Sequence, residues 1–326
     1  MTPSDPRTKG KDNFGLLAEF SKDSEIKRVA QAFRRVDPSG ERCASVFRDT
    51  YDYLYDGQHT GRYRWNQISK TERAHYGSLF EIKLRRQFDD IIDDGEDLDF
   101  NISGIEIDCK YSMERMGWMI PPKNRDKLVL GCFSNDEINV WNIGVVRASD
   151  AFLRTGRNWD RKKQINSLGR KNVHWIFPDS PMERNVLLDL SDEETRRIFS
   201  KRSGQQKLNE LFRVVQNTPI RSETIATLAQ QKDYMKRVRS NNGSRDHLKG
   251  EGFLILSGDY SAQKNICIEL GAAIPKRGQV VSLRVLEAQE GERFTTKLDG
   301  KCWRIAGKDE IVSAAAPRLP ESKKPS

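Results

Sequence analysis

The stretch LDFNISGIEIDCKYS, residues 98–112, contains two short runs of alternating apolar and polar residues that meet at Ser103 and Gly104. This pattern predicts two antiparallel strands joined by a tight turn. Successive side chains of a strand point to opposite faces, so Asp108 and Lys110 share one face and Cys109 points away from it. Burial of such a charged pair is unfavourable unless other interactions offset the desolvation. A surface salt bridge on an edge strand is the simplest explanation of a D-x-K pair, and the rest of the chain has to decide.

The surrounding sequence predicts a mixed α/β domain. Helical spacing of apolar residues covers Ser24–Val36, with Ser24 expected as the N-cap, and recurs over residues 44–55 and 70–88. Further strands are predicted at residues 127–134, 138–147 and 173–177. Helices that precede a run of strands indicate a mixed α/β architecture.

Changes in composition predict the domain boundaries. Two prolines between residues 178 and 188 mark a linker, and helices followed by short strands lie beyond it. We therefore expect a first domain over residues 26–177 and a second over residues 189–312. Residues 1–25 are predicted to be a mobile leader, and residues 313–326 a disordered tail.

Composition excludes several classes of protein. The 326 residues are 36% hydrophobic and 32% charged, and no apolar run approaches the ~20 residues of a membrane span. The five cysteines are odd in number and far apart, which argues against a disulfide framework and against a zinc site. The start of the chain lacks an apolar signal segment, so we expect a cytoplasmic protein with reduced thiols. A glycine-rich phosphate loop with its lysine is not found, so we expect no nucleotide cofactor.

The net charge of +9 is concentrated in one region. Residues 196–250 contain thirteen Lys or Arg and four Asp or Glu, which equals the excess of the whole chain. Such a block is typical of a phosphate-binding surface, although a solvated helix face gives the same pattern. The segment fits a helix-turn-helix with helices at residues 222–230 and 234–241. The candidate DNA-binding residues are Lys236, Arg237, Arg239, Arg245 and Lys249.

The strand pair also predicts a catalytic site. Asp99 lies on the first strand of the hairpin, and Glu81 lies on the preceding helix, so both carboxylates can approach Asp108 and Lys110. Three carboxylates beside a lysine suit Mg²⁺, which prefers oxygen ligands. The metal would stabilise charge on a phosphate oxygen, and the lysine would orient or help to deprotonate a water. This arrangement resembles the PD-(D/E)-x-K nucleases and predicts hydrolysis of phosphodiesters without a covalent intermediate.

Longer strings of sequence resemble the NaeI restriction endonuclease family. They include RDTYDYLYDGQHTGR, KTERAHYGSLFEIKL, IEIDCKYSM, WMIPP, NELFRVV, IATLAQQKDYMKRVR and KRGQVV, and they run in order from about Asp37 to Ile305. The resemblance implies a restriction-endonuclease-like α/β core and a C-terminal winged-helix or helix-turn-helix-like α+β domain. It places the catalytic residues at Glu81, Asp99, Asp108 and Lys110. It implies that the metal is held by Glu81, Asp99, Asp108 and the main-chain carbonyl of Cys109.

The same resemblance implies the biological setting. We expect a homodimeric, Mg²⁺-dependent type II enzyme that cuts double-stranded DNA at a GC-rich palindrome such as GCCGGC. A second copy of the target is expected to bind the C-terminal domain as an effector. Two alternatives remain open, a DNA-binding regulator with a vestigial nuclease domain and a mismatch-directed nicking endonuclease.

Overall fold

The computed structural model describes residues 23–156 and 159–320, and the chain divides into two compact units. The first unit comprises the chain up to Thr50 together with Ala74–Glu183, and the second comprises Tyr51–Arg73 together with the chain from Arg184 onward. The passage at Glu183–Arg184 lies inside the predicted linker, although β6 (His174–Ser180) occupies the first residues of that segment.

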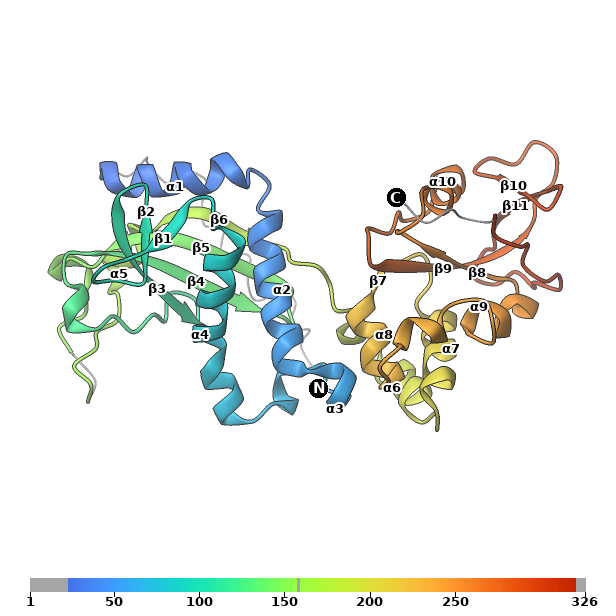
Figure 1. Ribbon diagram of the computed structural model, residues 1–326, viewed down its shortest axis with the longest axis horizontal. Helices are drawn as coiled ribbons and strands as arrows, with labels where there is room; N and C mark the ends of the chain where they lie inside the picture. The colour runs from blue at the N-terminus through green and yellow to red at the C-terminus, as the bar shows by residue number, and fades with distance from the viewer. Residues whose placement is uncertain (1–22, 157–158, 321–326) are drawn as a thin grey trace, which may run out of the picture. The chain divides into compact units, whose positions relative to one another are not determined.

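Six strands form the sheet of the first unit, in the order β1-β2-β3-β4-β5-β6 (Figure 1). Only β3 and β4 run parallel, and the other neighbours are antiparallel, so the sheet is mixed. The strands other than β6 are β1 (Ile92–Asp94), β2 (Phe100–Ile102), β3 (Ile105–Ser112), β4 (Leu128–Asn135) and β5 (Val140–Arg147). The predicted mixed α/β fold is confirmed.

Three helices cover one face of this sheet (Figure 1), namely α1 (Ser24–Val36), α2 (Glu41–Tyr55) and α4 (Lys70–Gln87). Aromatic side chains fill the layer between them and the strands. Phe47 of α2 stacks on Phe80 at 4.4 Å between ring centroids, and Tyr76 stacks on Tyr111 of β3 at 4.3 Å. This packing presses α4, which carries Glu81, onto the strand that carries Asp108.

The opposite face is covered by irregular chain and by α5 (Ser167–Lys171). Trp118 and Ile120 pack there with Leu153, Ile165 and other apolar residues, and each of these four is buried. Gly131 of β4 permits this, because a Cβ on it would lie 2.3 Å from the Trp118 ring. Since β4 is buried on both faces, it reads as a nearly continuous apolar run.

The start of α1 differs from the prediction. Asp23 is the N-cap, and its carboxylate accepts hydrogen bonds from the main-chain N–H groups of Glu25 and Ile26. Arg147 at the end of β5 also binds Asp23 and Glu25, each at 2.6 Å. Residues 23–25 therefore belong to the folded unit, whereas the rest of the predicted leader, residues 1–22, lies outside the described residues.

The second unit contains five strands, all of whose pairings are antiparallel. The central strand β9 (Gln279–Glu287) pairs with β7 (Ile220–Arg221), β8 (Phe253–Ser257) and β11 (Lys301–Ile305), and β11 pairs in turn with β10 (Thr296–Leu298). The helices are α3 (Gly57–Thr60), α6 (Asp192–Phe199), α7 (Gly204–Val214), α8 (Ser222–Ala229), α9 (Ser244–His247) and α10 (Ser261–Glu269).

The predicted second helix of the helix-turn-helix, residues 234–241, is wrong. Only a 3₁₀ turn forms there, at Tyr234–Arg237, and α9 follows it. Asn241 and Asn242 have φ values of 89° and 67°, which end any helix. The carboxylate of Asp246 accepts hydrogen bonds from both of their N–H groups and stabilises this turn. The first helix, by contrast, forms as α8.

Residues 313–320 of the predicted disordered tail are packed on the second unit, and residues 321–326 lie outside the described residues. Ala316 is buried, and its N–H donates to the carbonyl of Lys249. Leu319 packs against the apolar cluster formed by β8, β9 and α10. Residues 313–320 therefore cover part of the core of the second unit, because that face of β8 and β9 would otherwise be exposed.

The described residues contain no helix that is long and apolar enough to cross a membrane.

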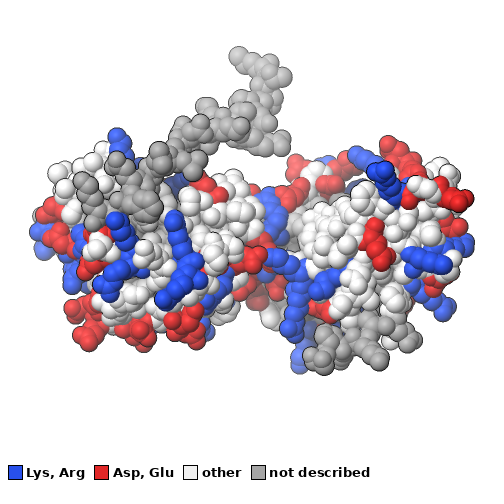
Figure 2. Space-filling view, turned by 90° about the horizontal axis from the view of Figure 1, so that it is seen from above, with Lys and Arg blue, Asp and Glu red and all other residues white. Residues whose placement is uncertain are grey.

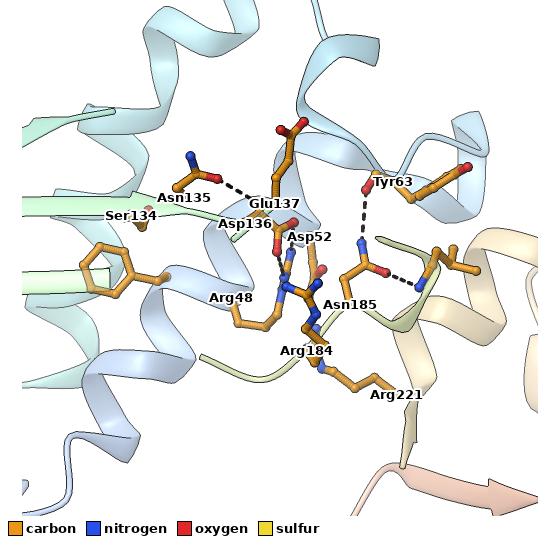
Figure 3. A network of polar contacts seen from close by, with 12 residues as sticks. Arg48, Asp52, Tyr63, Ser134, Asn135, Asp136, Glu137, Arg184, Asn185 and Arg221 are labelled. Atoms are coloured by element: carbon orange, nitrogen blue, oxygen red, sulfur yellow. Dashed lines mark hydrogen bonds and ion pairs between the residues drawn. The ribbon is translucent and has the colours of Figure 1, made fainter. Parts of the chain in front are cut away.

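A buried ion pair fixes α2 within the first unit. The Arg48 guanidinium binds both carboxylate oxygens of Asp136, at 2.5 and 3.0 Å, and each side chain is 1% exposed (Figure 3). Asp136 follows β4, so the pair links the helix to the end of a central strand. Such a pair is weak evidence for net stability, but loss of one partner removes a charge that balances the other at a buried position.

We therefore expect Arg48→Ala to lower the free energy of unfolding by about 3–5 kcal/mol, as found when one partner of a buried pair is removed. Urea denaturation followed by circular dichroism would measure the change. Lys301→Ala is the control, since Lys301 and its partner Glu287 are 58% and 46% exposed, and a surface pair contributes under about 1 kcal/mol. A loss of under about 1 kcal/mol for Arg48→Ala would contradict the assignment.

Candidate active site and nucleic-acid interface

The hairpin of β2 and β3 positions the candidate catalytic residues. Ser103 and Gly104 have φ values of 56° and 77°, which are those of the tight turn predicted at this position. Phe100 pairs with Ile107, so Asp99, immediately before β2, comes beside Asp108. Glu106 fixes the preceding loop, because its carboxylate accepts hydrogen bonds from the N–H groups of Glu96 and Asp97.

Three oxygen atoms converge on the ammonium of Lys110. Its Nζ lies 2.5 Å from Oδ2 of Asp108, 2.8 Å from the carbonyl oxygen of Cys109 and 3.4 Å from Oδ2 of Asp99. Asp99 also accepts a hydrogen bond from the N–H of Cys109 at 2.9 Å. Asp108 and Lys110 therefore share a face of β3, as the alternation predicts. The structure brings four of the predicted site residues together.

Glu81 faces the same group from α4. Burial raises the pKa of its carboxyl, and the negative charge of Asp99 adds to the shift. Its carboxylate forms an ion pair with Arg85, one turn along the helix, at 3.5 Å. The charges of Asp99, Asp108 and Lys110 therefore affect the pKa of Glu81, although its ion pair is with Arg85.

Asp108 is the most buried of the carboxylates, with a side chain that is 1% exposed. Burial raises the pKa of Asp108, and the interaction with the Lys110 ammonium opposes this shift. For Lys110, burial alone would lower the pKa, but its interactions with Asp108 and Asp99 outweigh that effect, so the pKa is raised. The lysine therefore stays protonated in this arrangement.

The alternation along β3 places the thiol of Cys109 on the face opposite Asp108 and Lys110. It lies against Cys132 of β4, and this contact, together with burial, raises the pKa of the Cys109 thiol well above its usual value. The main chain of Cys109 contacts the site, through its carbonyl oxygen toward Lys110 and its N–H toward Asp99.

The oxygen atoms around Lys110 suit a hard cation. Within the described residues, Oδ2 of Asp108 accepts no hydrogen bond of normal geometry, although it lies in ion-pair contact with Lys110. Among residues 23–156 and 159–320, no group of three or more His, Cys, Asp or Glu side chains has the spacing of a metal site. Carboxylate and carbonyl oxygens are nevertheless the kind of donor that Mg²⁺ prefers, and in this arrangement the ammonium of Lys110 lies between them.

Arg85 is a member of the site that the sequence analysis missed. It donates a hydrogen bond to the main-chain carbonyl of Asp99 at 2.9 Å, and it pairs with Glu81 and Asp94. The signal was present in the sequence, because Glu81 and Arg85 are separated by one helical turn. Arg85 positions Asp99 relative to α4.

The predicted DNA-binding residues fall into two groups. Lys236, Arg237 and Arg239 are exposed, and the first two line a groove with Gln231, Asn241 and Asn242. Arg245 instead donates to the carbonyl of Ile255 and to Gln263, and burial lowers its pKa. Lys249 is half-buried. Arg245 is therefore held inside the second unit, and the three exposed side chains remain accessible.

The excess of basic charge does not form a single patch on the face seen in Figure 2. Lys and Arg side chains are interspersed there with Asp and Glu side chains in each unit. The groove beside Lys236 and Arg237 lies within the second unit.

Comparison with known proteins identifies close similarity. The family model described as restriction endonuclease NaeI matches residues 27–314. The type II restriction enzyme NaeI of Lentzea aerocolonigenes is 40% identical over 301 residues, which cover 90% of this chain and 94% of that protein.

The raised pKa of Glu81 leads to a prediction about stability. A carboxyl group whose pKa is higher in the folded than in the unfolded chain costs stability when it is ionised. The cost is complete above the raised pKa and disappears as the pH falls below the ordinary value of 4.5. We expect Glu81→Gln to increase the free energy of unfolding at pH 8 and to have no such effect near pH 4.

Urea denaturation at several pH values would measure this difference. Glu72 on the same helix is the matched control, because hydrogen bonds to the main chain and side chain of Ser69 lower its pKa. Glu72→Gln should therefore decrease stability at pH 8, and the decrease should fade as the pH falls through the lowered pKa. A gain for Glu81→Gln that is equal at pH 4 and pH 8 would refute the electrostatic explanation.

Proposed function

Because the chain belongs to the NaeI family of restriction endonucleases, we propose that it cuts double-stranded DNA at a specific site with Mg²⁺ as its cofactor. Membership of the family makes it a type II site-specific deoxyribonuclease. The catalytic residues, the metal, the oligomeric state and the target are the content of the proposal.

One observation carries the assignment of the active site. Oxygen atoms of Asp108, Asp99 and the Cys109 carbonyl surround one positive charge, the Lys110 ammonium. A buried carboxylate that is held ready for a cation is costly for a purely structural protein and useful for a nuclease. The Glu81 carboxylate adds negative charge beside the same group.

Each residue has a chemical role in the proposed hydrolysis. Glu81, Asp99, Asp108 and the Cys109 carbonyl would hold Mg²⁺, which supplies stabilisation of the negative charge on the phosphate oxygens. Lys110 donates a hydrogen bond that orients the attacking water, because its raised pKa keeps it protonated. Arg85 holds Asp99 in place. The reaction breaks a P–O bond by direct attack of water, and the chain supplies no covalent nucleophile.

We propose that the second unit binds DNA through a winged-helix-like arrangement. The order α7, β7, α8, α9, β8, β9, with β9 pairing both β7 and β8, supports this proposal. The exposed side chains of Lys236, Arg237 and Arg239 would contact phosphates or base edges. Lys249, which is half-buried, is proposed as a further DNA contact, whereas Arg245 would support the segment because it is bound to Ile255 and Gln263.

The proposed target is a GC-rich palindrome similar to GCCGGC, read by a homodimer. A two-fold symmetric enzyme matches a palindromic site, because each subunit meets an identical half-site. A second copy of the target is proposed to bind the second unit and to activate cutting by the first. This would be allostery in the strict sense, with two distinct sites and a coupling free energy between them.

Incubation of plasmid DNA with the full-length protein and Mg²⁺ tests the proposal. We expect discrete fragments whose sequenced ends share one palindrome, no cutting in EDTA, and binding without efficient cutting in Ca²⁺, whose geometry is looser. Intact DNA with Mg²⁺ would favour a vestigial nuclease domain. Nicks confined to mispaired positions would favour the mismatch-directed enzyme.

Point variants test the catalytic residues. We expect Lys110→Ala and Asp108→Ala each to slow cleavage by about 10²–10⁴-fold, the range for removal of a group that acts on the reacting water or metal. Lys110→Ala should leave DNA binding nearly unchanged. Lys297→Ala, which removes an exposed lysine of β10, is the control and should cut normally. Near-normal cutting by either site variant would refute the assignment.

The effector role is tested on a plasmid with a single, slowly cut site. Short duplexes that contain the target should accelerate cleavage at moderate concentration. The double variant Arg237→Ala and Arg239→Ala should lose this acceleration, and its basal cutting should be reduced much less. Arg293→Ala together with Lys297→Ala removes two other exposed charges and should preserve the response. Simple competition at every duplex concentration would eliminate the effector model and leave the nuclease assignment intact.

A further inference from the structure

Two segments of the first unit are hydrogen-bonded to each other on the face of the sheet opposite α1, α2 and α4. Residues 119–127 connect β3 to β4, and residues 153–166 follow β5. Ile120 and Lys163 exchange main-chain hydrogen bonds at 2.8 and 2.9 Å, and the bridge between Leu153 and Ile165 closes the second segment on itself. The apolar side chains at these positions are buried, so the pair of segments has a fixed base.

The described part of these segments is strongly basic. Residues 119–127, 153–156 and 159–166 contain seven Lys or Arg and two Asp or Glu. They line two adjoining pockets that share Leu153 and Thr155. Arg125 and Lys163 both pair with Asp150. Arg154 and Arg161 are exposed, and neither has an acidic partner within the described residues.

An aromatic side chain projects from the same loop. Trp159 is 98% exposed, the largest exposure of any apolar side chain in the described chain. A tryptophan left in water beside several arginines and lysines suits a polyanion with flat, apolar rings, which is the chemistry of nucleic-acid bases. In Figure 1 this light-green loop projects away from the sheet.

The register of the sheet brings these segments to the end at which the candidate catalytic residues lie. Asp108 pairs with Val129 of β4, and Val129 pairs with Val146 of β5. Residue 127 precedes β4 and residue 148 follows β5. Each is two residues from the partners Val129 and Val146, which are aligned with Asp108 across the strands. The bases of the two segments therefore lie near the row that contains Asp108.

We propose that residues 119–127, 153–156 and 159–166 form the surface that grips the duplex to be cut. In this arrangement Arg154 and Arg161 contact phosphates, and Trp159 stacks on or wedges between bases. The inference rests on the proposed nuclease function. It assigns a DNA surface to the first unit that is separate from the basic block of residues 196–250.

The first test separates phosphate contacts from general charge. Single-turnover cleavage of a short single-site duplex by the full-length protein gives both a half-saturating enzyme concentration and a maximal rate. We expect the double variant Arg154→Ala and Arg161→Ala to raise the half-saturating concentration by about 10- to 100-fold, with a smaller change in the maximal rate. The slope of log affinity against log salt should become less negative by about 2, one for each lost phosphate contact.

The matched control is the double variant Arg35→Ala and Arg86→Ala, which removes two other exposed arginines of the first unit. It should leave the half-saturating concentration within about two-fold of the wild type. Equal behaviour of the two double variants would overturn the proposal. If the wild-type protein does not cut DNA at all, the proposed function fails instead, so the two failures are distinguishable.

Trp159 provides an independent signal. We expect quenching of tryptophan fluorescence when target duplex is added in Ca²⁺, and we expect this change to be absent in Trp159→Phe. Trp159→Ala should weaken the binding of target duplex by about ten-fold. Unchanged DNA affinity, together with a lower molecular mass in sedimentation, would overturn the assignment and identify Trp159 as a contact between copies of the chain.

Discussion

The first unit depends on one electrostatic constraint, the burial of the Asp108 carboxylate beside the Lys110 ammonium. Asp108 is almost inaccessible to water, and a single carboxylate in that position would be strongly disfavoured. The lysine offsets part of this cost, but it brings two more carboxylates and a main-chain carbonyl toward itself. The result is a cluster with more negative than positive groups. Such a cluster limits stability at neutral pH, and sites of this kind are retained where function requires them.

The scaffold around this cluster is rigid where the chemistry requires it. The tight turn at Ser103–Gly104 sets the register of β2 and β3, and a shift of one residue would send Asp108 to the opposite face. Glu106 holds the loop that leads to Asp99, and Arg85 fixes Asp99 from the helix. On the far face, Gly131 leaves room for Trp118. Local turns, the contact of Arg85 with Asp99 and the space that Gly131 leaves for Trp118 therefore fix the strands that carry these charged groups.

Much of this was predictable from residue patterns, and the exceptions have physical causes. The alternation in residues 98–112 predicted the hairpin and the shared face of Asp108 and Lys110, because that periodicity depends only on the backbone. The cap of α1 moved from Ser24 to Asp23, since Arg147, far away in sequence, binds the aspartate. The helix expected at residues 234–241 fails because Asn241 and Asn242 adopt positive φ. Arg245 looked like a DNA contact, yet the fold uses it to bind Ile255 and Gln263, a role that depends on tertiary packing. The basic segments around Trp159 escaped notice because their charges join only through the fold.

The composition of the second unit has a consequence for biosynthesis. Tyr51–Arg73 belongs to that unit, and the ring of Tyr63 stacks on Phe199 while its carbonyl accepts a hydrogen bond from Asn185 (Figure 3). Asp52 likewise pairs with Arg221. These partners leave the ribosome long after residues 51–73. The contacts of that stretch with them can therefore form only after much of the chain has been translated. A chain released early, near Glu183, would hold the complete set of candidate catalytic residues but not the partners of Asp52 and Tyr63. In such a fragment the ring of Tyr63 would lack its partner Phe199, so the fold of residues 51–73 depends on completion of the chain.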